Sequence, residues 1–140
     1  MGMAKLDTIH DTVKNALIKD GWTITDDPYV IQYEEMKLYA DLAAERVIAA
    51  EREGRKIVVE IKSFISPSRT QDFKLALGQY NLSLGLLEVT APDRKLYLAV
   101  SDHIYSKYFR QKAVQLIAER YQLALLVVNL EREEVVTWIR

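Results

Sequence analysis

The sequence predicts an α/β protein in which a mixed β-sheet is flanked by helices. Segments with apolar residues at helical spacing alternate with short segments rich in β-branched residues. Residues 123–130 are almost uniformly apolar, which is typical of a strand buried on both faces. Residues 47–51 and 56–64 read as two strands joined by a polar turn that contains Gly54, which predicts an antiparallel hairpin. Together these observations indicate a sheet with both parallel and antiparallel strands.

The first half of the chain begins with a predicted helix. Asp7 or Thr8 can cap this helix, apolar residues follow at helical spacing, and Gly21 can end it. Residues 26–28 (Asp-Asp-Pro) predict a turn, whereas residues 29–37 show no clear pattern. We expect the strands of this half at residues 22–24, 38–42, 47–51 and 56–64.

The second half starts where residues 66–68 (Ser-Pro-Ser) interrupt the preceding strand. A long amphipathic helix follows at residues 70–87, and Pro92 begins the next turn. Asp102 can cap a further helix, whose inner face we expect to be Tyr105, Phe109, Ala113, Leu116, Ile117 and Tyr121. Strands are expected at residues 95–100, 123–130 and 135–139.

Composition narrows the chemistry that the protein can perform. The 140 residues suit one domain, 1–140, and 49% of them are hydrophobic. The absence of Cys excludes disulfides, thiol catalysis and Cys-ligated zinc, and two His are too few for a multi-His site. A metal would therefore be held mainly by carboxylate oxygens, which favours Mg²⁺ or Mn²⁺. No apolar segment of membrane-spanning length or signal-peptide character is present, so we expect a cytoplasmic protein that binds no membrane.

The predicted strand at 56–64 carries an acid and an amine among apolar residues. Side chains alternate along a strand, so Glu60 and Lys62 share one face, with Cα atoms about 7 Å apart. The acid-x-Lys pattern occurs four times in the chain, but only this copy lies on a strand that reads as core. Burying charge is costly unless the charge is paired or bound to metal. Asp41 likewise interrupts an apolar stretch upstream, and a hairpin would bring it beside Glu60.

Such a site suits phosphodiester hydrolysis. Asp41 and Glu60 could share a Mg²⁺ ion that polarises the phosphate and lowers the pKa of a bound water. Lys62 would stabilise the developing negative charge or orient the attacking water. A serine hydrolase is disfavoured because no Gly-x-Ser-x-Gly elbow is present, and no Gly-rich loop suited to phosphate exists.

The motif resembles one found in restriction-endonuclease-like proteins. Asp41 followed by Glu60-Ile61-Lys62 is similar to the PD-(D/E)XK signature, with Ala40 where the proline would stand. The chain as a whole resembles the XisH family more closely, with Ala43 where Gly would be expected. The segments that carry this resemblance are 10–17, 20–25, 41–45, 59–64, 77–80 and 96–100.

The resemblance implies both a fold and a role. It implies a restriction-endonuclease-like fold and a cyanobacterial factor that controls the timed excision of a DNA element from a nitrogen-fixation gene. Such factors act beside a site-specific recombinase and a small companion protein, XisI. In several PD-(D/E)XK nucleases a Gln from the following helix supports the active site, and Gln79 stands at that place in this chain. A fold does not settle activity, so a non-catalytic accessory factor that binds DNA, XisI or the recombinase remains the second hypothesis.

Structural interpretations stand beside these functional ones. Asp41, Glu60 and Lys62 could be a simple ion-pair cluster at a strand end, and Gln79 could be a surface residue. His10 could face the metal or be a capping group, and Glu45 and Glu51 could supply a third acid or form exposed ion pairs. A basic patch of Lys107, Arg110 and Lys112 could contact DNA phosphates or be a solvated face, with Tyr105 and Tyr108 more typical of core. The apolar C-terminal strands also allow a homo-oligomer.

Overall fold

The computed structural model describes the backbone of residues 2–38 and 45–140, and the side chains of residues 9–38 and 47–140. The elements are, in chain order, α1 (Gly2–Lys19), β1 (Thr23–Asp26), β2 (Ile31–Tyr33), β3 (Met36–Leu38), β4 (Glu45–Arg52), β5 (Arg55–Lys62), α2 (Arg69–Thr90), β6 (Arg94–Ser101), α3 (Asp102–Ile104), a π-helical turn (Tyr105–Phe109), α4 (Lys112–Arg120), β7 (Leu125–Asn129) and β8 (Glu134–Ile139).

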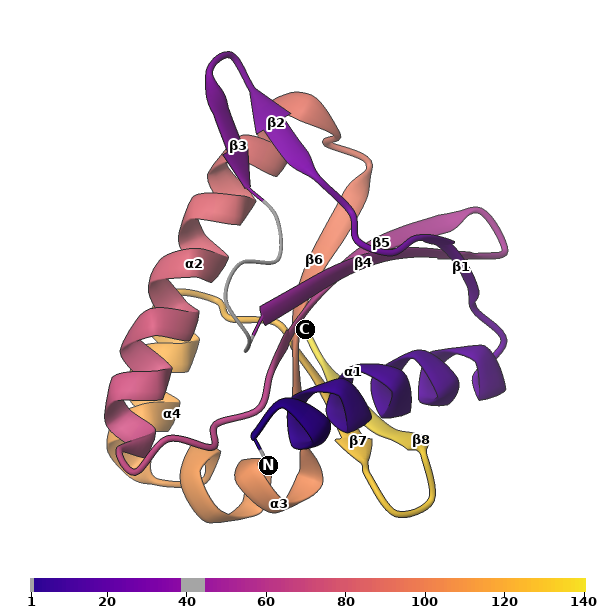
Figure 1. Cartoon of the computed structure of the whole chain (residues 1–140). Coiled ribbons are helices and arrows are strands. Elements are labelled where there is room, and N and C mark those ends of the chain that lie inside the picture. The colour runs from indigo at the N-terminus through magenta and orange to yellow at the C-terminus, as the bar shows by residue number, and fades with distance from the viewer. Residues whose placement is uncertain (1, 39–44) are drawn as a thin grey trace.

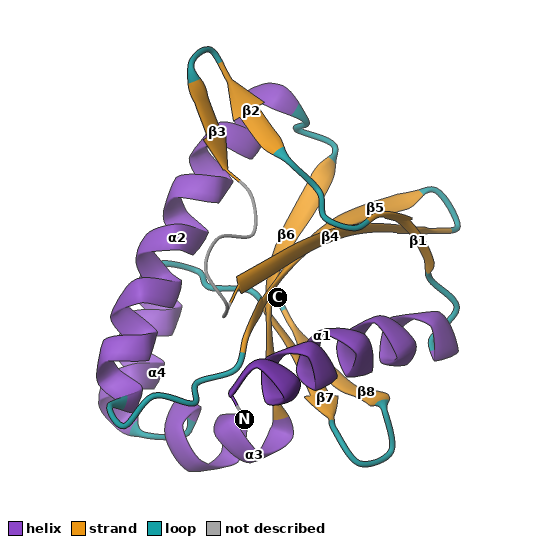
Figure 2. Ribbon diagram, viewed as in Figure 1, coloured by secondary structure: helices purple, strands orange, loops and turns teal. Residues whose placement is uncertain are grey.

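A six-stranded sheet forms the centre of the molecule, in the order β1-β4-β5-β6-β7-β8. The pairs β5–β6 and β6–β7 are parallel, and the pairs β1–β4, β4–β5 and β7–β8 are antiparallel. Strands β2 and β3 pair in a separate two-stranded sheet. The prediction of a mixed sheet is therefore confirmed (Figure 2).

Helices cover both faces of the sheet, as predicted (Figure 1). Helix α1 packs on the face that carries Ile57, Val59 and Ile61, and its buried residues belong to the same cluster. Helix α2 packs on the opposite face, in the cluster that contains Val58. The two clusters follow from the alternation of side chains along β5, because every second residue faces the same helix. No helix in the described part of the chain is long and apolar enough to cross a membrane.

The hairpin between β4 and β5 is the best-predicted local feature. Arg52 pairs with Arg55, so the loop contains only Glu53 and Gly54. Both loop residues have positive φ, at 52° and 79°, which is the geometry that two-residue hairpins with the right-handed strand twist require. Gly54 adopts this conformation without steric cost.

Several element boundaries differ from the sequence expectations. Asp7 and Thr8 lie inside α1 and do not cap it, because the helix begins at Gly2. Residues 29–37, which showed no pattern, contain most of the β2–β3 hairpin. Of the strand expected at 38–42, Leu38 ends β3 and the other four residues lie outside the described part of the chain. Strand β5 ends at Lys62, two residues early, because Phe64 has a φ of 55° that no strand accommodates.

The helix expected after Asp102 is broken, and part of its predicted inner face was wrong. Ser101 caps α3 through its side chain, and a π-helical turn then inserts extra backbone before α4 begins at Lys112. The insertion and the break shift the helical phase by about one residue. Val114 is consequently the buried residue of α4, whereas the expected inner residues Ala113, Leu116 and Tyr121 are exposed.

Candidate functional site

Glu60 and Lys62 lie on the face of β5 that is directed at α2. They share this face with Val58, which belongs to the core cluster under α2. Both are buried, each with 6% of its surface exposed. The sequence prediction that an acid and an amine share a buried face at the end of a core strand is therefore confirmed.

Helix α2 places one hydroxyl group against Glu60 and a second, that of Tyr80, one turn away. The Ser83 hydroxyl donates a hydrogen bond of 2.6 Å to Oε2 of Glu60, and Ser83 is itself 3% exposed. One helical turn earlier, the Tyr80 hydroxyl accepts from the Ala124 N–H at 3.2 Å and donates to the Leu96 carbonyl at 3.3 Å. Burial raises the pKa of Tyr80 above 10.0; the Ala124 hydrogen bond opposes this shift, and the negative charge of Glu60 adds to it. Tyr80 therefore stays neutral and ties α2 to β6, the strand that pairs with β5, and to Ala124 just before β7.

The chain leaves the sheet immediately after Lys62. Lys62 is the last residue of β5, and its backbone partner on β4 is Glu45. The Ser63 hydroxyl is buried and makes no hydrogen bond within the described structure. Phe64 then adopts its positive φ, a conformation that costs a bulky residue about 1–3 kcal/mol. Phe64 is held there by aromatic packing, with its ring centroid 5.6 Å from that of Phe109.

The other predicted members of the site are Asp41 and Gln79. Asp41 lies outside the described residues, and the strand that borders the Lys62 end of β5 begins at Glu45. Gln79 lies on α2 with an exposed side chain, next to Tyr80 in sequence. Of the expected group, the described structure brings together Glu60 and Lys62.

His10 belongs to a separate cluster on the other side of the sheet. It is 5% exposed, and its Nε2 lies 3.0 Å from Oδ2 of Asp27, the same oxygen that accepts from Lys14 Nζ at 2.9 Å. Burial favours the neutral carboxyl of Asp27, but the hydrogen bonds and positive charge from Lys14 and His10 outweigh it and lower its pKa below 3.8. His10 thus fastens α1 to the turn after β1, and α1 packs on the face opposite to Glu60.

The predicted basic patch is exposed, as a phosphate-binding surface requires. Lys107, Arg110 and Lys112 are all exposed, at the π-helical turn and the start of α4. Tyr108 is buried and donates to the Thr70 hydroxyl, and Tyr105 stacks on Phe109. The two tyrosines are therefore packing residues, as expected.

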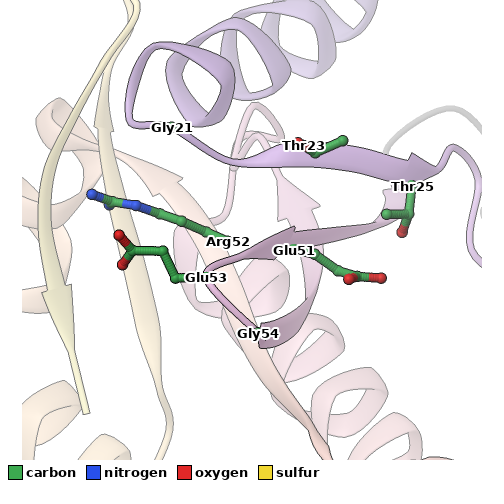
Figure 3. A pocket seen from close by; sticks show the side chains of 7 residues that line it. All are labelled: Gly21, Thr23, Thr25, Glu51, Arg52, Glu53 and Gly54. Atoms are coloured by element: carbon green, nitrogen blue, oxygen red, sulfur yellow. The ribbon is translucent and has the colours of Figure 1, made fainter.

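An open hollow of about 420 Å³ lies at the β4–β5 hairpin, lined by Gly21, Thr23, Thr25, Glu51, Arg52, Glu53 and Gly54. Figure 3 shows Arg52 and Glu53 directed to one side of the hairpin. The Nη1 atom of Arg52 also lies 3.5 Å from Oδ2 of Asp20. This hollow is at the start of β5, and Lys62 is the last residue of the same strand. Glu51 therefore lines a hollow at the end of β5 remote from Lys62.

The chemistry of the donors suits a hard divalent cation. A carboxylate such as Glu60 offers the oxygen ligands that Mg²⁺ and Mn²⁺ prefer, and Asp41 is of the same type. Over the described ranges, no three His, Asp or Glu residues gather into a metal-binding group. Of the predicted carboxylate pair, the described residues include Glu60, and its side chain is buried.

Sequence reasoning missed Ser83, which contacts Glu60. A signal was present, because Ser83 lies three residues after Tyr80 on the helix face that was expected to be apolar. A polar residue in such a stripe needs a hydrogen-bond partner, and Glu60 is that partner.

The protein is thus a mixed α/β domain with a buried acid and amine at the end of a central strand. The XisH protein family matches residues 3–136. A crystal structure of an XisH family protein from Nostoc punctiforme is 39% identical, covers 95% of this chain and 99% of its own, and superposes with a TM-score of 0.88. That of a fdxN element excision controlling factor protein from Anabaena variabilis is 41% identical, with 96% and 99% covered and a TM-score of 0.88. No protein with a curated description matches. The chain belongs to the XisH family.

Proposed function

We propose that this protein controls the programmed excision of a DNA element and does so by cleaving DNA at a PD-(D/E)XK-type site. The site would consist of Asp41, Glu60 and Lys62. One observation carries the proposal: Glu60 and Lys62 lie on the same buried face at the end of β5. The Anabaena variabilis relative, described as an excision controlling factor, supplies the biological setting. A role on bacterial DNA would place the protein in the cytoplasm.

Each residue of the site has a distinct role in this proposal. Asp41 and Glu60 would hold Mg²⁺ or Mn²⁺, which supplies Lewis acidity and a more acidic bound water. Lys62 would neutralise the negative charge that develops on the phosphate. The Ser83 hydroxyl orients the Glu60 carboxylate through its 2.6 Å hydrogen bond. Gln79 would support the site from the exposed side of α2.

Electrostatics supports a functional over a purely structural role for this pair. An ionised group in a protein interior loses several kcal/mol of hydration even when it is paired. A stability role alone would be served as well by apolar residues of the same volume, because buried ion pairs are often neutral or destabilising relative to them. The neighbouring residues on the same strand, Val58 and Val59, are apolar and fully buried. Apolar residues would therefore suit this part of β5, and the presence of Glu60 and Lys62 favours a functional role.

A nicking assay tests the proposal. Supercoiled plasmid would be incubated with the purified protein and Mg²⁺ or Mn²⁺, and relaxation would be followed over time. We expect Glu60→Gln and Lys62→Met each to lower the rate by about 10²–10³-fold, the effect of removing one group that stabilises a transition state. Glu51→Gln and Lys56→Met are matched controls from β4 and β5, and they should leave the rate unchanged.

Two results would contradict cleavage by this site. One is equal activity in the wild type, Glu60→Gln and Lys62→Met, which would assign the activity to a contaminant or to another site. The other is the absence of cleavage by the wild type, both alone and with XisI.

The absence of cleavage would support the second candidate, an accessory factor that binds DNA, XisI or a site-specific recombinase. Lys107, Arg110 and Lys112 favour this candidate, because three exposed cations close together in the chain can neutralise phosphates in a protein whose net charge is −1. Salt-dependent DNA binding that is lost when these three residues are replaced by Gln, and unchanged in Glu60→Gln, would identify it.

A further inference from the structure

Helix α2 has a second apolar face that is directed away from the sheet. Leu75, Leu82 and Val89 are 50%, 45% and 61% exposed and follow one another at intervals of seven residues. Gly78 and Gly85 lie between them, and a Cβ atom at either glycine would meet no atom within 4 Å in the described structure. Figure 1 shows α2 along one side of the molecule with the sheet on its inner side.

The spacing of these five residues is that of a coiled-coil seam. Steps of three and four residues along a helix place successive residues on one stripe, and the seven-residue repeat is the pattern of paired helices. The opposite face of α2 is buried and carries Phe73, Ala76, Tyr80, Ser83 and Leu87. The helix therefore packs on its own sheet with one face and presents a seam with the other. The two exposed glycines are unfavourable for an isolated helix, each by about 1 kcal/mol relative to alanine, so a reason for them is expected.

We propose that α2 pairs antiparallel with α2 of a second copy of this chain. When the twofold axis passes between Gly78 and Leu82, each leucine of one helix faces a glycine of the other. Leu82 then lies opposite the partner's Gly78, and Leu75 lies opposite the partner's Gly85. A large side chain fits into the space over a glycine, which lets the two backbones approach closely.

Charge supports a second copy as the occupant of this seam. Lys74 and Glu88 are exposed on the same flank of the stripe, one before Leu75 and the other before Val89. In the antiparallel arrangement Lys74 of one copy lies near the partner's Glu88, and the twofold axis repeats this pair at the other end. One surface thus supplies the leucines, the glycines that receive them and both partners of each ion pair, as an isologous interface must. This inference does not depend on the proposed DNA cleavage.

Sedimentation analysis over a range of concentrations tests the interface, since the monomer has a mass of 16.1 kDa and the dimer twice that. We expect Leu82→Lys to weaken dimerisation at least tenfold. Gly78→Gln should weaken it similarly and leave or raise the thermal midpoint of the monomer, because Gln favours helix and nothing near Gly78 obstructs its side chain. This second variant separates loss of the interface from loss of the fold.

A charge exchange tests the direction of pairing. Lys74→Glu and Glu88→Lys, each alone, place like charges together at both ends and should shift the equilibrium toward monomer. An equimolar mixture of the two variants should form a heterodimer, and the double variant should dimerise as the wild type does. Lys112→Glu on α4 is the matched control and should have no effect. A wild type that is monomeric at all concentrations, or a dimer that ignores every change in α2 and so forms elsewhere, such as at the β8 edge, would overturn the proposal.

Discussion

At the scale of single residues, Glu60 and Asp27 show how specific donors stabilise carboxylates in this protein. Glu60 accepts from Ser83, and Asp27 accepts from both Lys14 and His10 through the same oxygen. A buried carboxylate without such donors would lose stability through desolvation. The Asp27 cluster is therefore a structural use of the same chemistry that, at Glu60, is proposed to serve catalysis.

Asp27 makes the stability of the fold depend on pH in the acid range. Its pKa is lower in the folded protein than the ordinary 3.8, so its charged form stabilises the fold above that pH. This contribution is lost as the pH falls below 3.8 through the folded pKa. We expect Asp27→Asn to be less stable than the wild type near neutral pH and to approach it in acid. Urea midpoints measured from neutral pH to well below pH 3.8 would show this convergence.

Asp26→Asn is the matched control for this experiment. Asp26 is exposed and neighbours Asp27 in sequence, and its carboxylate accepts from Thr25. Its midpoints should follow those of the wild type at every pH. A constant difference between Asp27→Asn and the wild type over the whole range would refute the assigned role of the carboxylate charge.

At the scale of elements, local sequence rules work where the structure is decided within a few residues. Ser68 caps α2 by accepting from the Gln71 N–H, in the stretch of Ser and Pro that was expected to precede a helix. The Glu53-Gly54 turn closes the β4–β5 hairpin as expected. This hairpin holds Val47 beside Glu60, so its turn contributes to the register of the site.

We expect Gly54→Ala to destabilise the protein by about 1–2 kcal/mol. The cost arises from backbone conformation alone, because φ is 79° and no atom lies within 4 Å of the added Cβ in the described structure. Glu53→Asn should have the opposite sign and raise stability by a few tenths of a kcal/mol, since Asn tolerates positive φ better than Glu. The urea midpoints of both variants check these expectations, and a neutral Gly54→Ala would show that the turn can change type.

The helix after β6 shows where element-scale reasoning fails. Helical periodicity from Tyr105 onward assumed one continuous helix, and it placed Phe109 correctly in the core. The π-helical turn and the break before Lys112 then changed the phase, which exposed Leu116 to 64% and buried Val114. Periodicity contains no information about an inserted residue, because the aromatic cluster that stabilises the turn involves Phe64 and Phe73 from distant segments.

At the scale of the whole molecule, the two faces of the central sheet carry different kinds of residues. The α1 face is closed by an apolar cluster around Ile57, Val59 and Ile61. The α2 face carries the acid and the amine at the end of β5, and the outer surface of α2 carries the proposed dimer seam. If the proposed site binds metal, binding must stabilise the whole fold, because only the folded chain brings the ligands together.

We therefore expect Mn²⁺ or Mg²⁺ to raise the thermal midpoint, by about 5–10 °C at a concentration a hundredfold above the dissociation constant. Glu60→Gln should abolish the increase, whereas Glu51→Gln at the far end of the hairpin should retain it. Differential scanning fluorimetry with EDTA as the blank measures the effect. An equal increase in both variants and the wild type would indicate weak binding at other carboxylates and would argue against the Glu60 site.

Sequence patterns were sufficient to place β4, β5 and α2 to within three residues at each end, and to show that Glu60 and Lys62 share a face. These features depend on spacing and turn chemistry that act over a few residues. Which groups contact the acid depends on tertiary packing. Ser83 reaches Glu60 across 23 residues of chain, and the Tyr80 hydroxyl meets the Ala124 N–H across 44. Such contacts depend on how α2 packs on the sheet, and this packing is determined by many side chains together.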